Sequence, residues 1–91
     1  MELGLKGKVA MVAAASKGLG FGIAKALADE GAKLSIGSRT KDDIEAAALQ
    51  LRKENNSVVL SSVMDSSNPE SILDWTNDTI KEFGGVDKLV V

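Results

Sequence analysis

Residues 8–22 read KVAMVAAASKGLGFG and join an apolar run to a glycine-rich turn and then to a helix-like segment. An uninterrupted apolar run suits a strand that is buried on both faces, as in a parallel sheet. The small residues of the turn allow a ligand to approach the backbone closely, and the following helix directs its N-terminal N–H groups and positive dipole end at the turn. The stretch therefore predicts a strand–turn–helix unit with an anion site suited to a pyrophosphate.

Outward from this unit, short apolar runs alternate with segments of helical period. Along the rest of the chain we predict strands at 33–37, 58–63 and 86–91 and helices at about 19–30, 40–55 and 69–83. Gly31 is placed to end the first helix, Thr40 can cap the second, and Pro69 suits the first position of the third. This order predicts an α/β fold, a Rossmann-type doubly wound parallel sheet with only its N-terminal β-α-β-α-β-α-β portion.

Helical spacing also predicts which residues are buried. The buried stripe of the second helix is predicted to be Ile44, Ala47, Ala48 and Leu51. The inward face of the third helix is predicted to be Ile72, Trp75, Thr76, Thr79, Ile80 and Phe83.

Composition narrows the possible chemistry. The 91 residues include no Tyr, His or Cys, which excludes a thiol nucleophile, a disulfide, a Cys/His zinc site and a Ser-His-Asp triad, so we expect no metal site. The net charge of −2 gives no pull toward nucleic acid or anionic membranes. The apolar run 9–15 is too short to span a bilayer, and the start lacks a signal-peptide pattern. We therefore expect a cytoplasmic protein with neither a nucleic-acid nor a membrane partner.

The glycine spacing departs from two common phosphate motifs. Gly18, Gly20 and Gly22 do not form G-x-G-x-x-G, and a Gly-Lys-Ser/Thr sequence is missing, so nucleotide hydrolysis is not supported. The turn is also similar to the G-x-G-x-G turn of S-adenosylmethionine-dependent methyltransferases, which typically have an acidic residue at the end of the second strand. A turn that is glycine-rich only for tight packing is a further alternative.

The end of the second predicted strand bears on these alternatives. A dinucleotide fold that prefers NAD has Asp or Glu there to bind the ribose 2′-hydroxyl, but this chain has Ser38 and Arg39. A hydroxyl and a planar guanidinium favour the 2′-phosphate of NADP, and Lys17 adds a second cation in the turn. The alternative is that Lys17 and Arg39 are ordinary surface charges. We interpret the pattern as an NADP site.

From Leu5 to Val91 the chain resembles the N-terminal portion of the short-chain dehydrogenase/reductase family. It is most similar to the branch with 3-oxoacyl-acyl-carrier-protein reductases and glucose dehydrogenases. The family turn T-G-x-x-x-G-x-G aligns with residues 13–20, with Ala13 and Ala14 in place of Thr and Gly. If residue 14 needs a positive φ, its methyl group costs about 1 kcal/mol. The run 65–69, DSSNP, matches the family's Asp-Val-Thr-Asp-Pro, and FGGVDKLVV at 83–91 resembles the run before its N-N-A-G motif.

The resemblance implies roles for three groups of residues. Ser16, Lys17, Gly18, Leu19 and Gly20 would form the phosphate turn, Ser38 and Arg39 would take the 2′-phosphate, and Asp65 and Ser66 would hold adenine. Asp65 also has an alternative interpretation as a turn or helix-approach residue.

The resemblance also implies what the whole protein does. The family's catalytic Asn, Ser, Tyr and Lys come later in the sequence, so no catalytic role is carried over to any residue here. We expect residues 1–91 to be a partial NADP-binding Rossmann domain, a fragment of a longer single-domain enzyme. That enzyme would be a homo-oligomer that transfers hydride between nicotinamide and a small carbonyl or alcohol substrate, and the 91-residue chain would be inactive. The alternative is a naturally short, non-enzymatic nucleotide-binding or interaction module.

Overall fold

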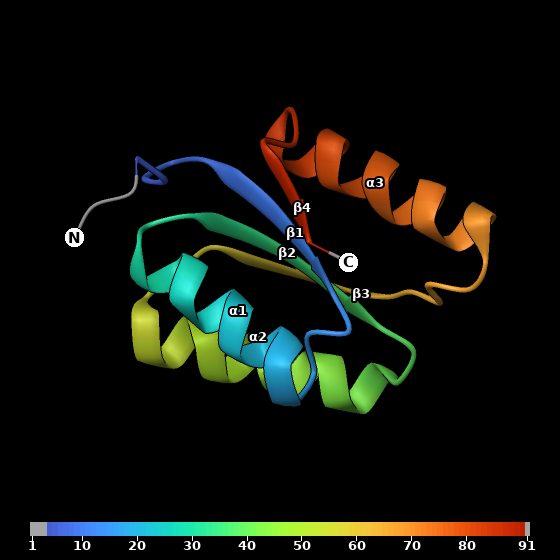
Figure 1. The fold of residues 1–91 in the computed structure, drawn as a ribbon, viewed down its shortest axis with the longest axis horizontal. Helices are drawn as coiled ribbons and strands as arrows, with labels where there is room; N and C mark the ends of the chain where they lie inside the picture. Colours follow the sequence, from blue (N-terminus) through green and yellow to red (C-terminus); the bar gives the residue numbers. More distant parts are fainter. Residues whose placement is uncertain (1–3, 91) are drawn as a thin grey trace.

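The computed structural model describes residues 4–90, and Figure 1 shows their arrangement. Strands and helices alternate along this part of the chain: β1 Val9–Ala13, α1 Gly18–Asp29, β2 Lys33–Ser38, α2 Lys41–Asn55, β3 Val59–Val63, α3 Pro69–Phe83 and β4 Lys88–Val90. Each predicted element is present. The prediction for the last strand also included Val91, which lies outside the described residues.

The strands form a parallel sheet in the order β3-β2-β1-β4. Helices α1 and α2 lie on one face of this sheet and α3 lies on the other (Figure 1). This strand order corresponds to the part of the Rossmann sheet that its first four strands form. The predicted doubly wound α/β fold is therefore confirmed, and the carboxyl ends of β1, β2 and β3 lie at the same edge of the sheet.

The larger core lies between the sheet and the pair α1 and α2. Alternate residues of the two central strands, such as Val12 and Ile36, point toward it and are fully buried. The predicted stripe of α2 packs here, and all of its members are buried: Ile44, Ala47, Ala48 and Leu51. The helical spacing of apolar residues therefore correctly predicted the buried face of α2.

The core under α3 is smaller and partly polar. The indole N–H of Trp75 donates to Ser35 Oγ at 2.9 Å, and Ser35 Oγ lies 2.6 Å from Thr79 Oγ1. The Thr79 hydroxyl donates to the Trp75 carbonyl oxygen at 2.8 Å, so Ser35 is left as the donor to Thr79. All three residues are buried, and this hydrogen-bond chain links β2 to α3. Gly37 allows the indole to lie close to the sheet, because a Cβ there would lie 3.2 Å from Trp75 Cε2.

Two predictions about the helices are confirmed only in part. Of the predicted inward face of α3, Trp75 and Thr79 are buried, Ile72, Thr76 and Phe83 are partly buried, and Ile80 is 45% exposed. The fully buried contact of α3 is therefore a narrow stripe, in which Trp75 and Thr79 lie one helical turn apart. Thr40 lies at the N-cap of α2 but its hydroxyl makes no capping hydrogen bond, and its carbonyl oxygen accepts from the Ile44 N–H instead. Gly31 follows the end of α1 with φ of +88°, as expected for a helix C-terminus.

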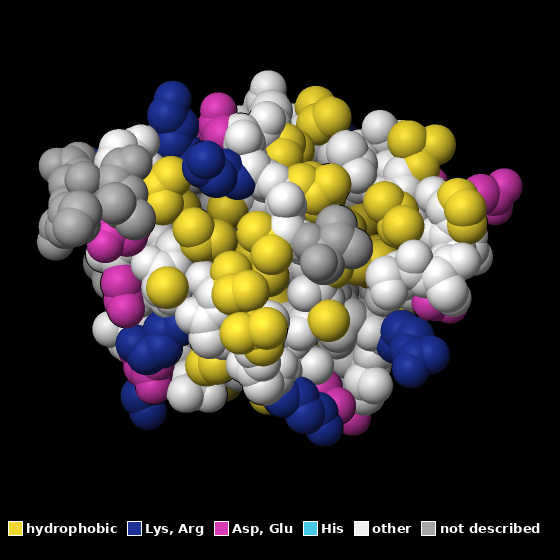
Figure 2. Space-filling model, viewed as in Figure 1, with side chains coloured by type: hydrophobic (Ala, Val, Ile, Leu, Met, Phe, Trp, Pro, Cys, Tyr) yellow, Lys and Arg dark blue, Asp and Glu magenta, His cyan; other side chains and the backbone are white. Residues whose placement is uncertain are grey.

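The face that carries β4 exposes apolar side chains. Figure 2 shows hydrophobic side chains gathered over the middle of this face, with most charged side chains toward its margins. Leu89 of β4 is 54% exposed, and β4 lies at one edge of the sheet. Among the described residues, no helix combines the length and hydrophobicity that crossing a membrane requires.

Candidate functional site

A pocket of about 630 Å³ lies at the carboxyl ends of β1, β2 and β3. Its volume falls within the range of about 300–1,000 Å³ that is typical of small-molecule sites. Open α/β sheets bind their ligands outside the carboxyl ends of the strands. The described residues that line it are Ala14, Ser16, Lys17, Ser38, Arg39, Thr40, Asp43, Met64, Asp65, Ser66 and Ser67.

The turn between β1 and α1 forms one wall of this pocket. Ala14 has a φ of +53° and Gly18 a φ of +63°, so the turn does place residue 14 in the left-handed region. A Cβ on Gly20 would lie 2.1 Å from the Ala14 carbonyl oxygen, whereas a Cβ on Gly22 would meet nothing within 4 Å. The packing explanation therefore accounts for Gly20 but not for Gly22.

The N-terminus of α1 differs from those of the other two helices. Lys17 is its N-cap and makes no capping hydrogen bond, and the first turn contains no acidic residue. In contrast, α3 is capped by Asn68, whose Oδ1 accepts from the N–H of Glu70 at 3.0 Å. Helix α2 has Asp42 and Asp43 in its first turn. The positive end of α1 is therefore not matched by an acidic side chain of its own first turn, and its N–H groups lack a side-chain cap.

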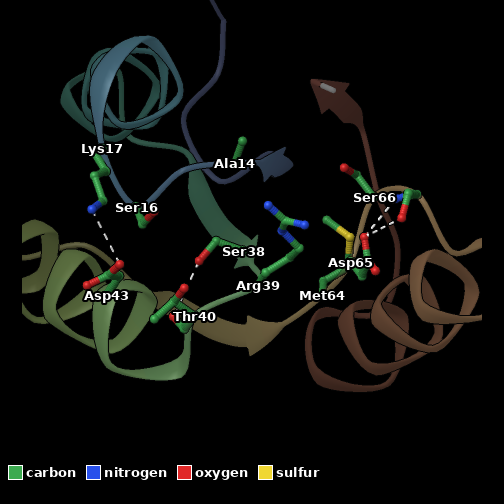
Figure 3. Close-up of a pocket in the computed structure, with 11 residues that line it drawn as sticks. Ala14, Ser16, Lys17, Ser38, Arg39, Thr40, Asp43, Met64, Asp65 and Ser66 are labelled. Atoms are coloured by element: carbon green, nitrogen blue, oxygen red, sulfur yellow. Dashed lines mark hydrogen bonds and ion pairs between the residues drawn. The ribbon is translucent and has the colours of Figure 1, made fainter.

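The last residue of β2, Ser38, and the residue that follows it, Arg39, form the middle of the pocket. Ser38 is buried, and its hydroxyl donates a long hydrogen bond of 3.5 Å to the carbonyl oxygen of Thr40, two residues later in the chain. Arg39 is exposed, and its side chain extends into the space between Ala14 and Asp65 (Figure 3). Within residues 4–90 its guanidinium forms no hydrogen bond or ion pair, so its donors are free to bind an anion.

An ion pair crosses the opposite side of the pocket. Lys17 Nζ lies 3.5 Å from Asp43 Oδ2, and the two residues come from different helix N-termini (Figure 3). One of the two cations that line the pocket therefore already has a carboxylate partner.

Asp65 follows β3 and forms a tight turn. Its Oδ1 accepts from the Ser67 hydroxyl at 2.7 Å and from the Ser67 N–H at 3.0 Å. These bonds, with a smaller contribution from the positive charge of Arg39, hold the pKa of Asp65 below its ordinary value. The backbone N–H of Asp65 donates to Ser71 Oγ at 2.9 Å, which fixes the turn to α3. The turn-residue interpretation of Asp65 is therefore correct, and a contact with adenine stays a prediction.

The structure brings together most of the predicted site residues. The pocket is lined by Ser16, Lys17, Ser38, Arg39, Asp65 and Ser66, whereas Gly18, Leu19 and Gly20 belong to the start of α1 and are not part of the lining. Sequence reasoning did not assign Asp43 to the site, although its position in the first turn after Arg39 placed it at the correct edge of the sheet. In the described part of the chain, no group of three or more acidic side chains is arranged to hold a metal ion.

Comparison with known proteins identifies the family. Residues 8–91 match the sequence model of the short chain dehydrogenases. The chain belongs to the short-chain dehydrogenase family. Membership in this family rules out the methyltransferase alternative, but it does not distinguish part of an enzyme from a short binding module.

Individual short-chain dehydrogenases are similar over nearly the whole chain. The 3-oxoacyl-(acyl-carrier-protein) reductase FabG of Vibrio cholerae is 41% identical over 88 residues, which are 97% of this chain and 34% of that protein. L-sorbose reductase from Gluconobacter frateurii, solved in complex with NADPH and L-sorbose, has a TM-score of 0.94 and 34% identity, and the match covers 98% of this chain and 34% of that one. A xylitol dehydrogenase bound to NAD+ has a TM-score of 0.89 and 26% identity, over 94% and 33% of the two chains. The chain thus spans about a third of the length of these relatives.

Proposed function

We propose that this chain is the cofactor-binding part of an NADP(H)-dependent short-chain oxidoreductase. The whole protein would transfer hydride between the nicotinamide and a carbonyl or alcohol group of a small substrate. The observation that carries the NADP assignment is the position of Arg39, which follows β2 and extends into the pocket a guanidinium with no hydrogen-bond or ion-pair partner among residues 4–90.

The charges around Arg39 suit a phosphate on the ribose. An NAD-preferring site has a carboxylate here to bind the ribose 2′-hydroxyl, and that carboxylate would repel a 2′-phosphate. Arg39 instead offers a planar set of donors that matches phosphate oxygens. The Lys17 ammonium lines the same pocket and adds positive charge. Ser38 and Arg39 are therefore proposed to bind the 2′-phosphate together with Lys17.

The fit extends to the rest of the dinucleotide. The uncapped N–H groups at the start of α1, with no acid in the first turn, suit the pyrophosphate. Residues 16–20 would pass around it, and Asp65 and Ser66, at the far side of the pocket, would lie against the adenine. When bound, the cofactor supplies the hydride-transfer chemistry, and this chain binds and orients it.

Family membership alone leaves the cofactor open. L-sorbose reductase was solved with NADPH, while the xylitol dehydrogenase was solved with NAD+. We therefore base the proposed preference on this chain's own residues that line the pocket, among which Ser38, Arg39 and Lys17 suit the phosphorylated form.

The test compares the dissociation constants of NADPH and NADH in the intact protein, before and after Arg39→Ala. Hydrogen bonds to a charged group contribute about 1.5–3 kcal/mol, so NADPH should bind about 10- to 100-fold more weakly while NADH changes less than about twofold. Lys41→Ala is the matched control, because it removes one exposed cation two residues away that does not line the pocket. Equal affinity for the two cofactors in the unsubstituted protein would refute the NADP assignment.

Catalysis in the whole protein would depend on residues outside this chain. The 91 residues contain no Tyr, and the family to which they belong uses a tyrosine as acid and base. We therefore expect the 91-residue chain to bind NADPH without oxidising it in the presence of carbonyl compounds. Oxidation of NADPH by this chain, measured as loss of absorbance at the nicotinamide band, would contradict the assignment.

A further inference from the structure

The Lys17–Asp43 ion pair occupies a position that matters for the choice of cofactor. Lys17 Nζ and Asp43 Oδ2 are 3.5 Å apart, and both residues line the pocket (Figure 3). The Lys25–Asp29 pair, in contrast, lies within α1 at ordinary helical spacing. The Lys17–Asp43 pair links the start of α1 to the first turn of α2, and so it joins two walls of the pocket.

Charge in the pocket is balanced between two cations and two carboxylates. Among the described residues that line it, Lys17 and Arg39 are basic and Asp43 and Asp65 are acidic. Asp65 uses Oδ1 for two bonds from Ser67, so its geometry is explained by its own turn. Asp43 receives no such bonds among the described residues, and its described partner is Lys17.

An incoming 2′-phosphate would have to compete with Asp43 for Lys17. The Lys17 ammonium must either leave the Asp43 carboxylate or be shared between two anions. A cofactor without the 2′-phosphate does not meet this cost. Asp43 therefore weakens the binding of the phosphorylated cofactor selectively, by holding Lys17.

We propose that Asp43 is a specificity-determining residue that restrains Lys17 and thereby narrows the preference for NADPH over NADH. This inference rests on the proposed binding of a nicotinamide dinucleotide in this pocket. Asp43 acts through Lys17 and is a positioning residue.

The exposure of the pair sets the size of the effect. The side chains of Lys17 and Asp43 are 77% and 42% exposed, so solvent weakens their attraction. Exposed pairs of this kind contribute up to about 1 kcal/mol, which corresponds to about fivefold in a dissociation constant. Asp43→Asn is therefore expected to tighten NADPH binding about three- to fivefold at low salt and to leave NADH within about twofold. The gain should shrink as ionic strength rises.

Calorimetric titration of the intact protein with NADPH and with NADH tests this. The matched control is Asp42→Asn, which removes the same charge from the same helical turn at a residue that does not line the pocket. The gain with Asp43→Asn should exceed that with Asp42→Asn and should disappear when Lys17→Met is added. A circular dichroism spectrum of each variant checks that the fold is unchanged.

Each other outcome is decisive. Equal effects of Asp43→Asn and Asp42→Asn would show only a general charge effect and would overturn the inference. A gain that persists with Lys17→Met would mean that Asp43 acts on the phosphate directly, which overturns the restraint of Lys17. If NADPH binds and the ratio of the NADPH and NADH dissociation constants does not change with Asp43→Asn, only this inference fails. If the unsubstituted protein binds neither cofactor, the proposed function fails with it.

Discussion

Replacement of Ser35 by alanine removes one hydroxyl from the buried hydrogen-bond chain that joins β2 to α3. The Trp75 indole N–H loses its acceptor at 2.9 Å, and Thr79 Oγ1 loses its donor at 2.6 Å. Trp75 is 2% exposed and Thr79 is fully buried, so water cannot replace the lost partner without moving the helix. A buried donor left without an acceptor costs about 1–3 kcal/mol, and the lost bond to Thr79 adds about 1 kcal/mol. We expect Ser35→Ala to lower the free energy of unfolding by about 2–4 kcal/mol.

A double-mutant cycle isolates the indole contribution. With Trp75→Phe in place there is no indole N–H to leave unpaired, so Ser35→Ala should then cost only about 1 kcal/mol. Urea unfolding followed by far-ultraviolet circular dichroism measures all variants, including those without tryptophan. Ser61→Ala, at a partly exposed serine of β3, is the control and should change stability by less than about 0.5 kcal/mol. The reasoning is refuted if Ser35→Ala matches this control or if the effects of Ser35→Ala and Trp75→Phe are additive.

Three further predictions concern the pocket walls. Gly20→Ala should destabilise the fold by about 2–3 kcal/mol, because its methyl group would meet the carbonyl oxygen of residue 14. Gly22→Ala should stabilise the fold by about 1 kcal/mol, because its methyl group would meet nothing within 4 Å and alanine favours a helix. Urea unfolding of the two variants measures both effects. Ala14→Gly should raise the unfolding free energy by about 0.5–1 kcal/mol, since it relieves a positive φ, and thermal unfolding would show a lower midpoint if this is wrong. The bonds from Ser67 lower the pKa of Asp65, so their stabilising contribution is complete above about pH 4 and is lost as pH falls through the lowered pKa of the folded state. Ser67→Ala should raise that pKa in a carboxyl-carbon NMR titration, and an unchanged pKa would contradict the assigned cause.

Much of the fold could be predicted because it follows from local periodicity. The stripe that includes Ile44 and Leu51 repeats at helical spacing, and the sheet that it contacts is apolar on that face, so pattern and burial agree. On the other face the sheet presents Ser35 and Gly37, which favour close approach through a narrow stripe. Ile80 is therefore left exposed, although its spacing is that of an inward residue.

The candidate site could also be predicted only in part from the sequence. Residues at or just after the ends of strands, such as Ser38, Arg39 and Asp65, could be placed because the carboxyl ends of parallel strands share one edge of a sheet. Asp43 could not be placed, because its contact with Lys17 depends on how two helix N-termini lie relative to each other. That arrangement comes from the packing of α1 and α2 on the sheet and is not a local property of either segment.

The three helices begin at the carboxyl edge of the sheet, and their N-termini differ in the capping and acidic residues that they carry. Helix α3 has the Asn68 cap and Glu70 in its first turn, and α2 has two aspartates, so both already contain the negative groups that their dipoles favour. Helix α1 has a lysine at its N-cap and no acid in its first turn. A Ser or Asp cap there would stabilise α1 by about 1 kcal/mol, but its oxygen would occupy the N–H groups proposed to bind the pyrophosphate. The missing cap is therefore understandable as stability given up for binding, and the aspartate that α1 lacks is supplied from α2, where it can moderate Lys17 without blocking the helix end.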